Sequence, residues 1–338
     1  MKKIYGIIIL CTLFAVCLCG CAKETAGKNT ASANDSKIKI VTTIFPEYDW
    51  VMNILGDKKD DADVTLLLDK GVDLHSFQPS ADDIMKISDC DMFIYVGGES
   101  DGWVHDALSQ AVNKDMVAVN LLETLGDRVK EEETVEGMEH EHEDGDEHED
   151  GEEHDHEDEE ELDEHVWLSL DNAALVCDVI TESVSKIDPA NADVYSENLK
   201  AYKAELSKLD AEYENAVSSA SKNTVLFADR FPFRYLTDDY GLEYFAAFSG
   251  CSAESEASFE TVIFLAGKID QLGLNTILTI ENNDQKIAKT VRENTAAKDM
   301  EILTMNSMQS VTSTDIKNGT TYLEIMQDNL EVLTQALK

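Results

Sequence analysis

Six of the eight histidines in this 338-residue chain lie in one acidic run at residues 137–170, "GMEHEHEDGDEHEDGEEHDHEDEEELDEHVWLSL". Imidazole nitrogens and carboxylate oxygens both bind divalent metal ions, so the run carries the donor types of a metal site. A run this acidic is also typical of a solvated insertion with no packed structure. The sixth histidine, His165, differs from the rest because it directly precedes the apolar stretch "VWLSL".

The other five histidines of the run stand among glycines and carboxylates, and they are His140, His142, His148, His154 and His156. A metal site in such a loop must order its own backbone, at a cost of about 1–2 kcal/mol per residue. A preformed cleft has already met that cost. We therefore expect these five to form an auxiliary loop that binds zinc weakly and raises its concentration near a tighter site.

Much of the formal net charge of −42 comes from this part of the chain, since residues 131–164 hold 22 Asp or Glu and no Lys or Arg. The remaining ~300 residues are moderately acidic and long enough to bury one large core or two smaller ones. No basic patch is present to neutralise phosphates, so the sequence excludes a nucleic-acid partner.

The N-terminus starts with two lysines and an apolar run at residues 4–18, too short to span a bilayer and typical of a secretory signal. The run ends in "LCGC", which resembles a bacterial lipobox. That resemblance implies a signal peptide at 1–20, lipidation of Cys21, and an extracytoplasmic protein anchored to the cell membrane. The alternative is a plain secreted protein. Residues 21–36 are small and polar, as in a flexible tether.

Three cysteines remain beyond this leader: Cys90, Cys177 and Cys251. Their number is odd, they are widely spaced, and they lack zinc-ribbon spacing. A disulfide between two of them stays open, but we expect buried, unpaired thiols.

Apolar strand-like segments alternate with helical ones along the chain. The first half offers "KIKIVTTIFP", "ADVTLLLD", "DMFIYVGG" and "MVAVNL", and the second half offers "TVLFA", "LEYFAAF", "NTILTI" and "EILTM". Alternation of this kind predicts parallel α/β sheets, with ligand-carrying loops at the carboxyl ends of the strands.

One long amphipathic helix separates the two halves. It follows Asp188-Pro189, and Tyr and Leu residues recur in it at steps of three and four as far as Val217. The sequence thus predicts two α/β lobes with parallel sheets, at 37–187 (including the insertion 131–164) and 223–338, joined by a spanning helix at 188–222.

The motifs "GVDLHSFQPSADDIMKISDCDMFIYVGG", "DEHVWLSLDNA", "IDPANADVYSENLKAYKAELSKLD" and "TYLEIMQDNLEVLTQAL" resemble the metal-binding lipoproteins of zinc and manganese ABC importers. The resemblance covers nearly all of residues 37–338. It implies one metal ion in the cleft between the lobes, an ABC permease as partner, and no enzymatic activity. It makes His75 and His165 the first two metal ligands.

The second lobe departs from the family pattern. The family's third ligand position falls on Arg230, which cannot bind a metal, so we expect the neighbouring Asp229 to do so. The fourth position falls on Asn306, a poor zinc ligand. Glu281 is our candidate replacement, with three alternatives: Glu254, Glu256 and Cys251.

Two histidines and a carboxylate suit tetrahedral zinc, so zinc is the expected cargo. Alternatives are a manganese- or iron-selective member of the same family, and a surface adhesin or metallochaperone. A metallohydrolase is disfavoured because the chain has no H-E-x-x-H motif.

Overall fold

The computed structural model describes residues 37–138, 161–252 and 256–338, which belong to one compact unit starting at Lys37. Several predictions concern residues outside these ranges: the signal peptide, the tether, Cys21, the five histidines of the auxiliary loop, and Glu254. Among the described residues, no helix is both long and apolar enough to cross a membrane.

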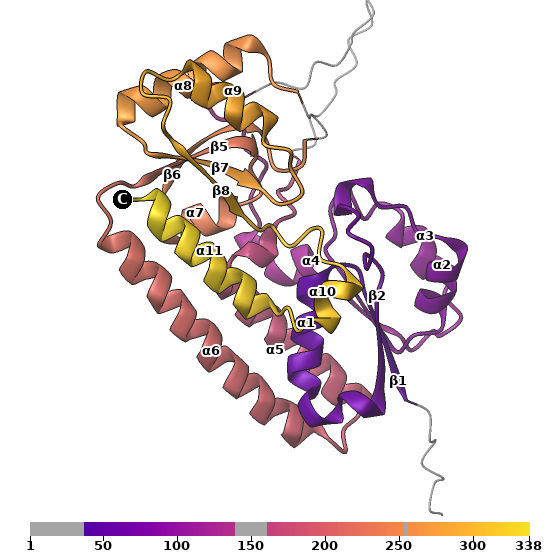
Figure 1. Ribbon diagram of the computed structural model, residues 1–338. Helices are drawn as coiled ribbons and strands as arrows, with labels where there is room; N and C mark the ends of the chain where they lie inside the picture. The colour runs from indigo at the N-terminus through magenta and orange to yellow at the C-terminus, as the bar shows by residue number, and fades with distance from the viewer. Residues whose placement is uncertain (1–36, 139–160, 253–255) are drawn as a thin grey trace, which may run out of the picture. The chain divides into compact units, whose positions relative to one another are not determined.

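The first lobe is built on a parallel sheet with strand order β2-β1-β3-β4 (Figure 1). Its strands are short and largely buried, as their apolar sequences predict. Their bounds are β1 Ile38–Thr42, β2 Ala62–Leu66, β3 Met92–Tyr95 and β4 Val117–Asn120. The helices of this lobe are α1 Phe45–Leu55, α2 Ala81–Ser88, α3 Val104–Ser109, α4 Leu121–Leu125 and α5 Leu170–Ile187.

The second lobe repeats the arrangement with a parallel sheet of order β6-β5-β7-β8. Helices α8 and α9 pack against this sheet, and α11 packs against β7 and β8 (Figure 1). The strands are β5 Thr224–Arg230, β6 Glu243–Phe248, β7 Thr276–Ile280 and β8 Glu301–Met305. The helices are α7 Arg234–Tyr240, α8 Phe259–Leu272, α9 Lys286–Asn294, α10 Ser313–Lys317 and α11 Tyr322–Ala336.

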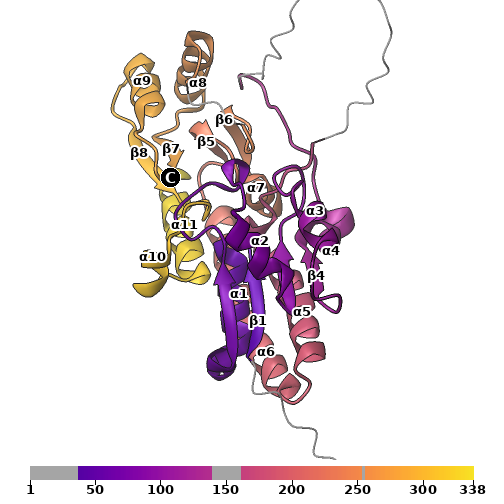
Figure 2. The same ribbon diagram turned by 90° about the vertical axis from the view of Figure 1, so that its right-hand side faces the viewer.

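A 27-residue helix, α6 (Ala192–Ser218), joins the lobes and is about 40 Å long at 1.5 Å per residue. It packs against α1 and α5 of the first lobe and against α11 of the second (Figures 1 and 2). The helix starts later than Asp188-Pro189 predicts, because the Asp188 carboxylate accepts hydrogen bonds from Asn191 and Tyr195 and holds a turn.

The main hydrophobic core runs through both lobes, and a smaller core lies under α8 and α9. Trp50 of α1 and Tyr322 of α11 meet edge to face in the main core, with ring centroids 5.4 Å apart. Because the lobes share one apolar core, their facing loops are held at a fixed separation. The predicted fold class, two α/β lobes with parallel sheets and one long connecting helix, is confirmed.

Candidate metal centre

His75 lies in a 3₁₀ turn, Leu74–Ser76, beyond the carboxyl end of β2. The Asp73 side chain starts this turn by accepting a hydrogen bond from the His75 backbone N–H at 3.0 Å. On the ring, Nδ1 lies 2.8 Å from Ser100 Oγ and 3.5 Å from Glu164 Oε2. These acceptors favour a proton on Nδ1, which leaves the Nε2 lone pair free.

His165 is fully buried in the loop before α5. Its Nδ1 lies 3.0 Å from Asp163 Oδ1, and the same oxygen accepts a hydrogen bond from the His165 backbone N–H at 2.9 Å. Trp167 fixes the segment that follows, as the sequence suggests. Its indole N–H donates to Ser307 O, and its carbonyl accepts from the Tyr322 hydroxyl. Asp163 therefore holds the ring of His165, and the contacts of Trp167 hold the backbone that follows it.

The two rings present their Nε2 atoms to each other at 3.2 Å. With both protons on Nδ1, two lone pairs face each other, which is unfavourable unless a cation lies between them. A tetrahedral zinc ion with Zn–N distances of about 2.0–2.1 Å places two ligand nitrogens about 3.3 Å apart. The separation fits one ion shared by the two rings.

The electrostatics of His75 also suit a metal ligand. Burial, together with the nearby His165 and Arg230, lowers the pKa of His75 to about 3. The ring is therefore neutral at physiological pH, and neutral imidazole is the form that binds metals.

Cys251 is the third residue of this group. Its sulfur and the ring nitrogens of His75 and His165 all lie within 4.8 Å of one another. Burial and the neighbouring Glu132 raise the pKa of the Cys251 thiol. All three described cysteines are unpaired, and Cys90 and Cys177 are buried away from this group, as the sequence predicts for structural thiols.

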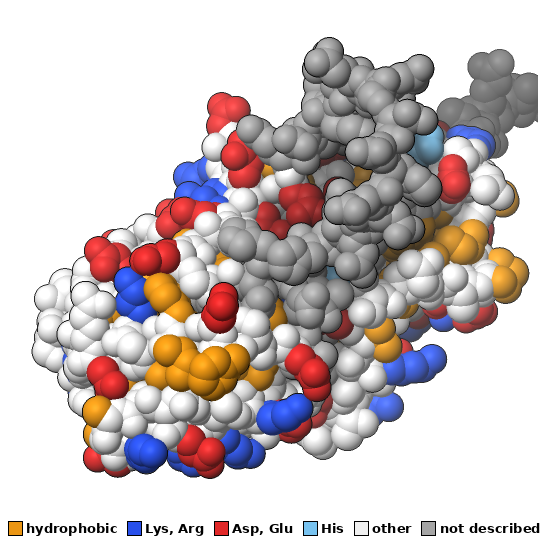
Figure 3. Space-filling model, turned by 90° about the horizontal axis from the view of Figure 1, so that it is seen from above, with side chains coloured by type: hydrophobic (Ala, Val, Ile, Leu, Met, Phe, Trp, Pro, Cys, Tyr) orange, Lys and Arg blue, Asp and Glu red, His pale blue; other side chains and the backbone are white. Residues whose placement is uncertain are grey.

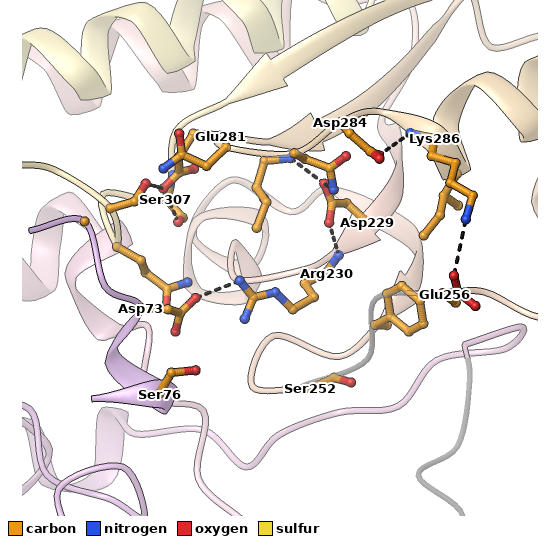
Figure 4. A pocket seen from close by; sticks show the side chains of 18 residues that line it. Asp73, Ser76, Asp229, Arg230, Ser252, Glu256, Glu281, Asp284, Lys286 and Ser307 are labelled. Atoms are coloured by element: carbon orange, nitrogen blue, oxygen red, sulfur yellow. Dashed lines mark hydrogen bonds and ion pairs between the residues drawn. The ribbon is translucent and has the colours of Figure 1, made fainter. Parts of the chain in front are cut away.

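Asp229, the expected third ligand, does not join the group. It lies inside β5, which extends two residues beyond the predicted strand, and its Oδ2 accepts from the Ile280 backbone N–H at 2.9 Å and from Asn283 Nδ2 at 2.7 Å. Its Oδ1 accepts from the Arg230 backbone N–H at 2.9 Å. Both oxygens therefore already have protein partners, and the bonds to Oδ2 hold the end of β5 to the end of β7 (Figure 4).

Glu281, the expected fourth ligand, is also engaged elsewhere. Its carboxylate accepts from the backbone N–H and the hydroxyl of Ser307 at 2.7 and 2.8 Å (Figure 4). The alternative Glu256 is exposed and pairs with Lys286 at 3.2 Å. The geometry therefore gives no support to Asp229, Glu281 or Glu256 as ligands.

Asp229 and Glu281 instead line a polar cavity of about 680 Å³ next to the histidines. Arg230 and Asp73 form an ion pair in it, with Nη2 and Oδ2 2.7 Å apart (Figure 4). Arg230 is thus engaged in an ion pair, and its guanidinium cannot act as a metal ligand.

Sequence reasoning missed Gln309, which follows β8. Its side-chain Nε2 lies 3.3 Å from His165 Nε2, and its buried Oε1 has no hydrogen-bond partner in the part of the chain that the structure describes. Asn306, which occupies the family's fourth ligand position, shapes the same loop by accepting from the Met308 backbone N–H at 2.7 Å. Because an amide carries no charge and is a weak metal ligand, nothing in the sequence marked Gln309 as a residue of the site.

The acidic insertion leaves the fold beside this group. Its two described ends pair as a short antiparallel stem, through a bridge between Glu131 and Leu162 and the Glu132 N–H···Glu161 O hydrogen bond at 2.7 Å. Stem residues line a pocket together with His75 and Cys251. Burial and the like charges of Glu99 and Glu132 raise the pKa of Glu161 to about 7. Acidic side chains also lie elsewhere on the face shown in Figure 3.

Two parallel α/β lobes on one spanning helix, with polar loops that meet between them, define the two-lobed class of solute-binding proteins. The chain belongs to the family described as zinc-uptake complex component A, periplasmic (ZnuA), whose sequence profile matches residues 40–336.

Individual relatives agree with this assignment. The high-affinity zinc uptake system protein ZnuA of Bacillus subtilis is 32% identical over 337 residues, which cover 99% of this chain and 98% of that protein. The zinc-binding protein AdcA of Streptococcus pyogenes serotype M3 is 30% identical over 304 residues, 88% of this chain but 56% of AdcA. The chain therefore spans about half the length of the AdcA proteins.

A solved structure shows the same fold. The Zn(II)-bound ZnuA-like domain of Streptococcus pneumoniae AdcA superposes with a TM-score of 0.67 at 28% identity, covering 89% of this chain and 99% of that domain.

Proposed function

We propose that this chain is the extracytoplasmic component of a metal ABC importer, and that it captures zinc in the interlobe cleft and delivers it to the permease. The observation that carries the proposal is the pair of Nε2 atoms 3.2 Å apart, each on a ring whose Nδ1 already has a partner. Its relatives named for zinc uptake and zinc binding support the choice of metal.

The carboxylates behind the two histidine rings support the same assignment. Asp163 and Glu164 lie against the two rings and are both almost fully buried. Carboxylates behind ligating histidines fix the ring orientation and compensate the charge of the ion. The protein performs capture and release, and we assign it no enzymatic activity.

The insertion fits a role in capture. Its stem opens at the pocket that contains His75 and Cys251, so ions bound weakly by the five loop histidines would be released next to the tighter site.

Membrane attachment through Cys21 completes the proposal, because a lipid anchor keeps the carrier near its permease. Replacing Cys21 with Ser should move the protein from the membrane fraction to the medium.

The central experiment is a zinc titration of the protein with a competing chelator. His75→Ala and His165→Ala should each abolish the tight site, whereas His105→Ala should leave it unchanged because His105 is exposed outside the cleft. Equal zinc affinity in all three variants would contradict the proposed site.

Manganese is the competing cargo. Manganese prefers carboxylate and water oxygens, while imidazole and sulfur donors suit zinc. Zinc should therefore displace manganese at equal concentrations, and a preference for manganese would identify the manganese-selective alternative.

A further inference from the structure

We infer that the sulfur of Cys251, which loses its proton to solvent when the metal binds, and the side-chain amide oxygen of Gln309 complete the metal site, giving a four-coordinate set of two nitrogens, one sulfur and one oxygen. This inference rests on the proposed function and names the two ligands that the second lobe contributes. Neither residue is a carboxylate, so the site differs from the expected pair of Asp229 and Glu281, although Cys251 was one of the alternatives.

The position of Cys251 is built by its neighbour Gly250. A Cβ atom at residue 250 would lie 2.9 Å from His165 Cε1 and 3.0 Å from the Phe231 carbonyl oxygen. Only glycine lets the loop after β6 approach the ring so closely. The Cys251 backbone N–H then donates to Glu132 Oε1 at 2.8 Å, which fixes the loop from the other side.

The sulfur is within reach of a shared ion. A tetrahedral zinc with Zn–S of about 2.3 Å and Zn–N of about 2.0–2.1 Å sets the S···N separation at about 3.6 Å. The sulfur and one ring nitrogen of each histidine lie within 4.8 Å of one another, at most about 1.2 Å more than this separation, so a small movement of the loop closes the site.

Gln309 supplies the fourth position. Its side-chain amide nitrogen lies 3.3 Å from His165 Nε2, the spacing of two ligands on one tetrahedral ion. The side chain is only 5% exposed, and its oxygen lacks a hydrogen-bond partner among the described residues. A half turn of the amide exchanges the two atoms and directs the oxygen at the ion, which satisfies this acceptor.

The loop that carries Gln309 is held in an unusual conformation. Met308, although not glycine, has a φ of 66° and is 1% exposed. The Ser307 backbone N–H donates to Glu281 and the Met308 backbone N–H donates to Asn306 Oδ1, and these hydrogen bonds keep this backbone in place. Strain of this kind persists where the surrounding contacts over-determine it, as at ligand sites. Glu281 and Asn306 thus act as positioning residues.

Sulfur ligation has a consequence for selectivity. Thiolate favours zinc and other soft ions over manganese, so Cys251 should be the residue that decides between them. One thiolate leaves a single positive charge on the zinc, and the buried Asp163 and Glu164 behind the rings offset it.

The test is to load the reduced full-length protein with Co(II), whose thiolate complexes show a sulfur-to-metal charge-transfer band in the near ultraviolet. Wild type should show the band, Cys251→Ser should lose it while still binding cobalt weakly, and Cys90→Ser should keep it. Zinc affinity should fall by about 100-fold or more in Cys251→Ser, beyond the 10–100-fold loss typical of residues behind the ligands. The ratio of zinc affinity to manganese affinity should also fall in Cys251→Ser.

Gln309→Ala should weaken zinc binding, and Gln309→Glu should strengthen it by adding a charge. Unchanged affinity in Gln309→Ala would mean that water fills the fourth position and would overturn that part of the inference. Tight cobalt binding without the band would overturn the role of Cys251 alone, while no tight binding at all would overturn the proposed function.

The melting temperatures of the metal-free variants show whether Cys251→Ser folds. If it does not fold, X-ray absorption of the zinc-loaded wild type decides the question. One sulfur neighbour at about 2.3 Å supports the inference, and a shell of nitrogen and oxygen alone contradicts it.

Discussion

Arg230 Nη2 lies 2.7 Å from Asp73 Oδ2, and this ion pair connects the end of β5 in the second lobe to the turn that carries His75 in the first. The pair neutralises a positive charge close enough to His75 to help lower its pKa. A permanent cation beside a site for a divalent cation opposes binding, so Asp73 has two roles: it starts the turn, and it compensates Arg230.

These roles predict a specific double-mutant result. Asp73→Asn keeps an acceptor for the His75 backbone N–H but leaves Arg230 unpaired, so zinc affinity should fall by roughly 10–100-fold. Adding Arg230→Gln should recover part of that loss, because the uncompensated charge is gone. Competition titrations of wild type, both single variants and the double variant measure this. A double variant no tighter than Asp73→Asn would show that the charge of Arg230 is irrelevant.

Gly250→Ala should weaken zinc binding at least about 10-fold, because the added Cβ meets His165 and the Phe231 carbonyl and pushes the Cys251 loop away. Gly267→Ala is the matched control: it lies in α8 with no atom within 4 Å of an added Cβ, so it should bind zinc normally and gain about 1 kcal/mol of stability. Equal zinc affinity in Gly250→Ala and Gly267→Ala would show that Gly250 does not position a metal ligand.

Much of the fold follows from local sequence signals. Ser80 and Asp83 form the capping box that begins α2, and Ser258 caps α8. These signals act over three or four residues, so the sequence carries them completely. His75 and His165 were likewise identified from motifs around them, and the structure brings their rings together.

The two ligands that we infer in the second lobe were not the expected pair, since Cys251 was only one of three alternatives to Glu281 and Gln309 was not predicted. Whether Asp229 is free to bind a metal depends on Ile280 and Asn283, more than fifty positions away, which use its oxygen. The closeness of Cys251 depends on the packing of Gly250 against a ring from the other lobe. Contacts between residues far apart in the chain thus decide which side chains are free to bind a metal. The spacing of residues in one sequence does not predict such contacts.

Tyr322→Phe should destabilise the protein without removing a metal ligand. The Tyr322 hydroxyl donates to the Trp167 carbonyl at 2.7 Å inside the shared core, so its loss leaves a buried acceptor unpaired. We expect a loss of about 1–3 kcal/mol in the free energy of unfolding, measured with denaturant on the metal-free protein. Zinc should stabilise wild type and variant by the same amount, because it binds only the folded state and both keep the same ligands. A larger difference in stability with zinc than without it would show that the Tyr322 hydroxyl also supports the metal site.

Stability of the metal-free protein should depend on pH through Glu47. The side chain is fully buried and accepts hydrogen bonds from the backbone N–H groups of Thr43 and Ile44, while burial and Asp101 raise its pKa to about 8. The unfolded chain has an ordinary carboxyl pKa near 4.5, so the folded state binds the proton more tightly. Its stabilising contribution is complete below about pH 4.5 and is lost as the pH rises through about 8.

Glu47→Gln removes this titration, so its melting temperature should fall less than that of the wild type between pH 5 and 9. Part of the pH dependence of the melting temperature should remain in Glu47→Gln, because burial also raises the pKa of Asp101 to about 7. Parallel curves for wild type and variant would show that Glu47 is ionised throughout.

Removal of residues 139–160 tests the role of the insertion. A short Gly-Ser linker in their place keeps the described stem, including the Glu132–Glu161 hydrogen bond and the contact from Glu132 to the Cys251 backbone N–H. The tight zinc site should then persist with unchanged affinity, because His75, His165 and Cys251 lie outside the deleted segment. Calorimetric titration should lose only weaker additional sites, and zinc loading at limiting concentration should slow. Loss of the tight site would contradict a role limited to capture and would place an essential ligand among the deleted histidines.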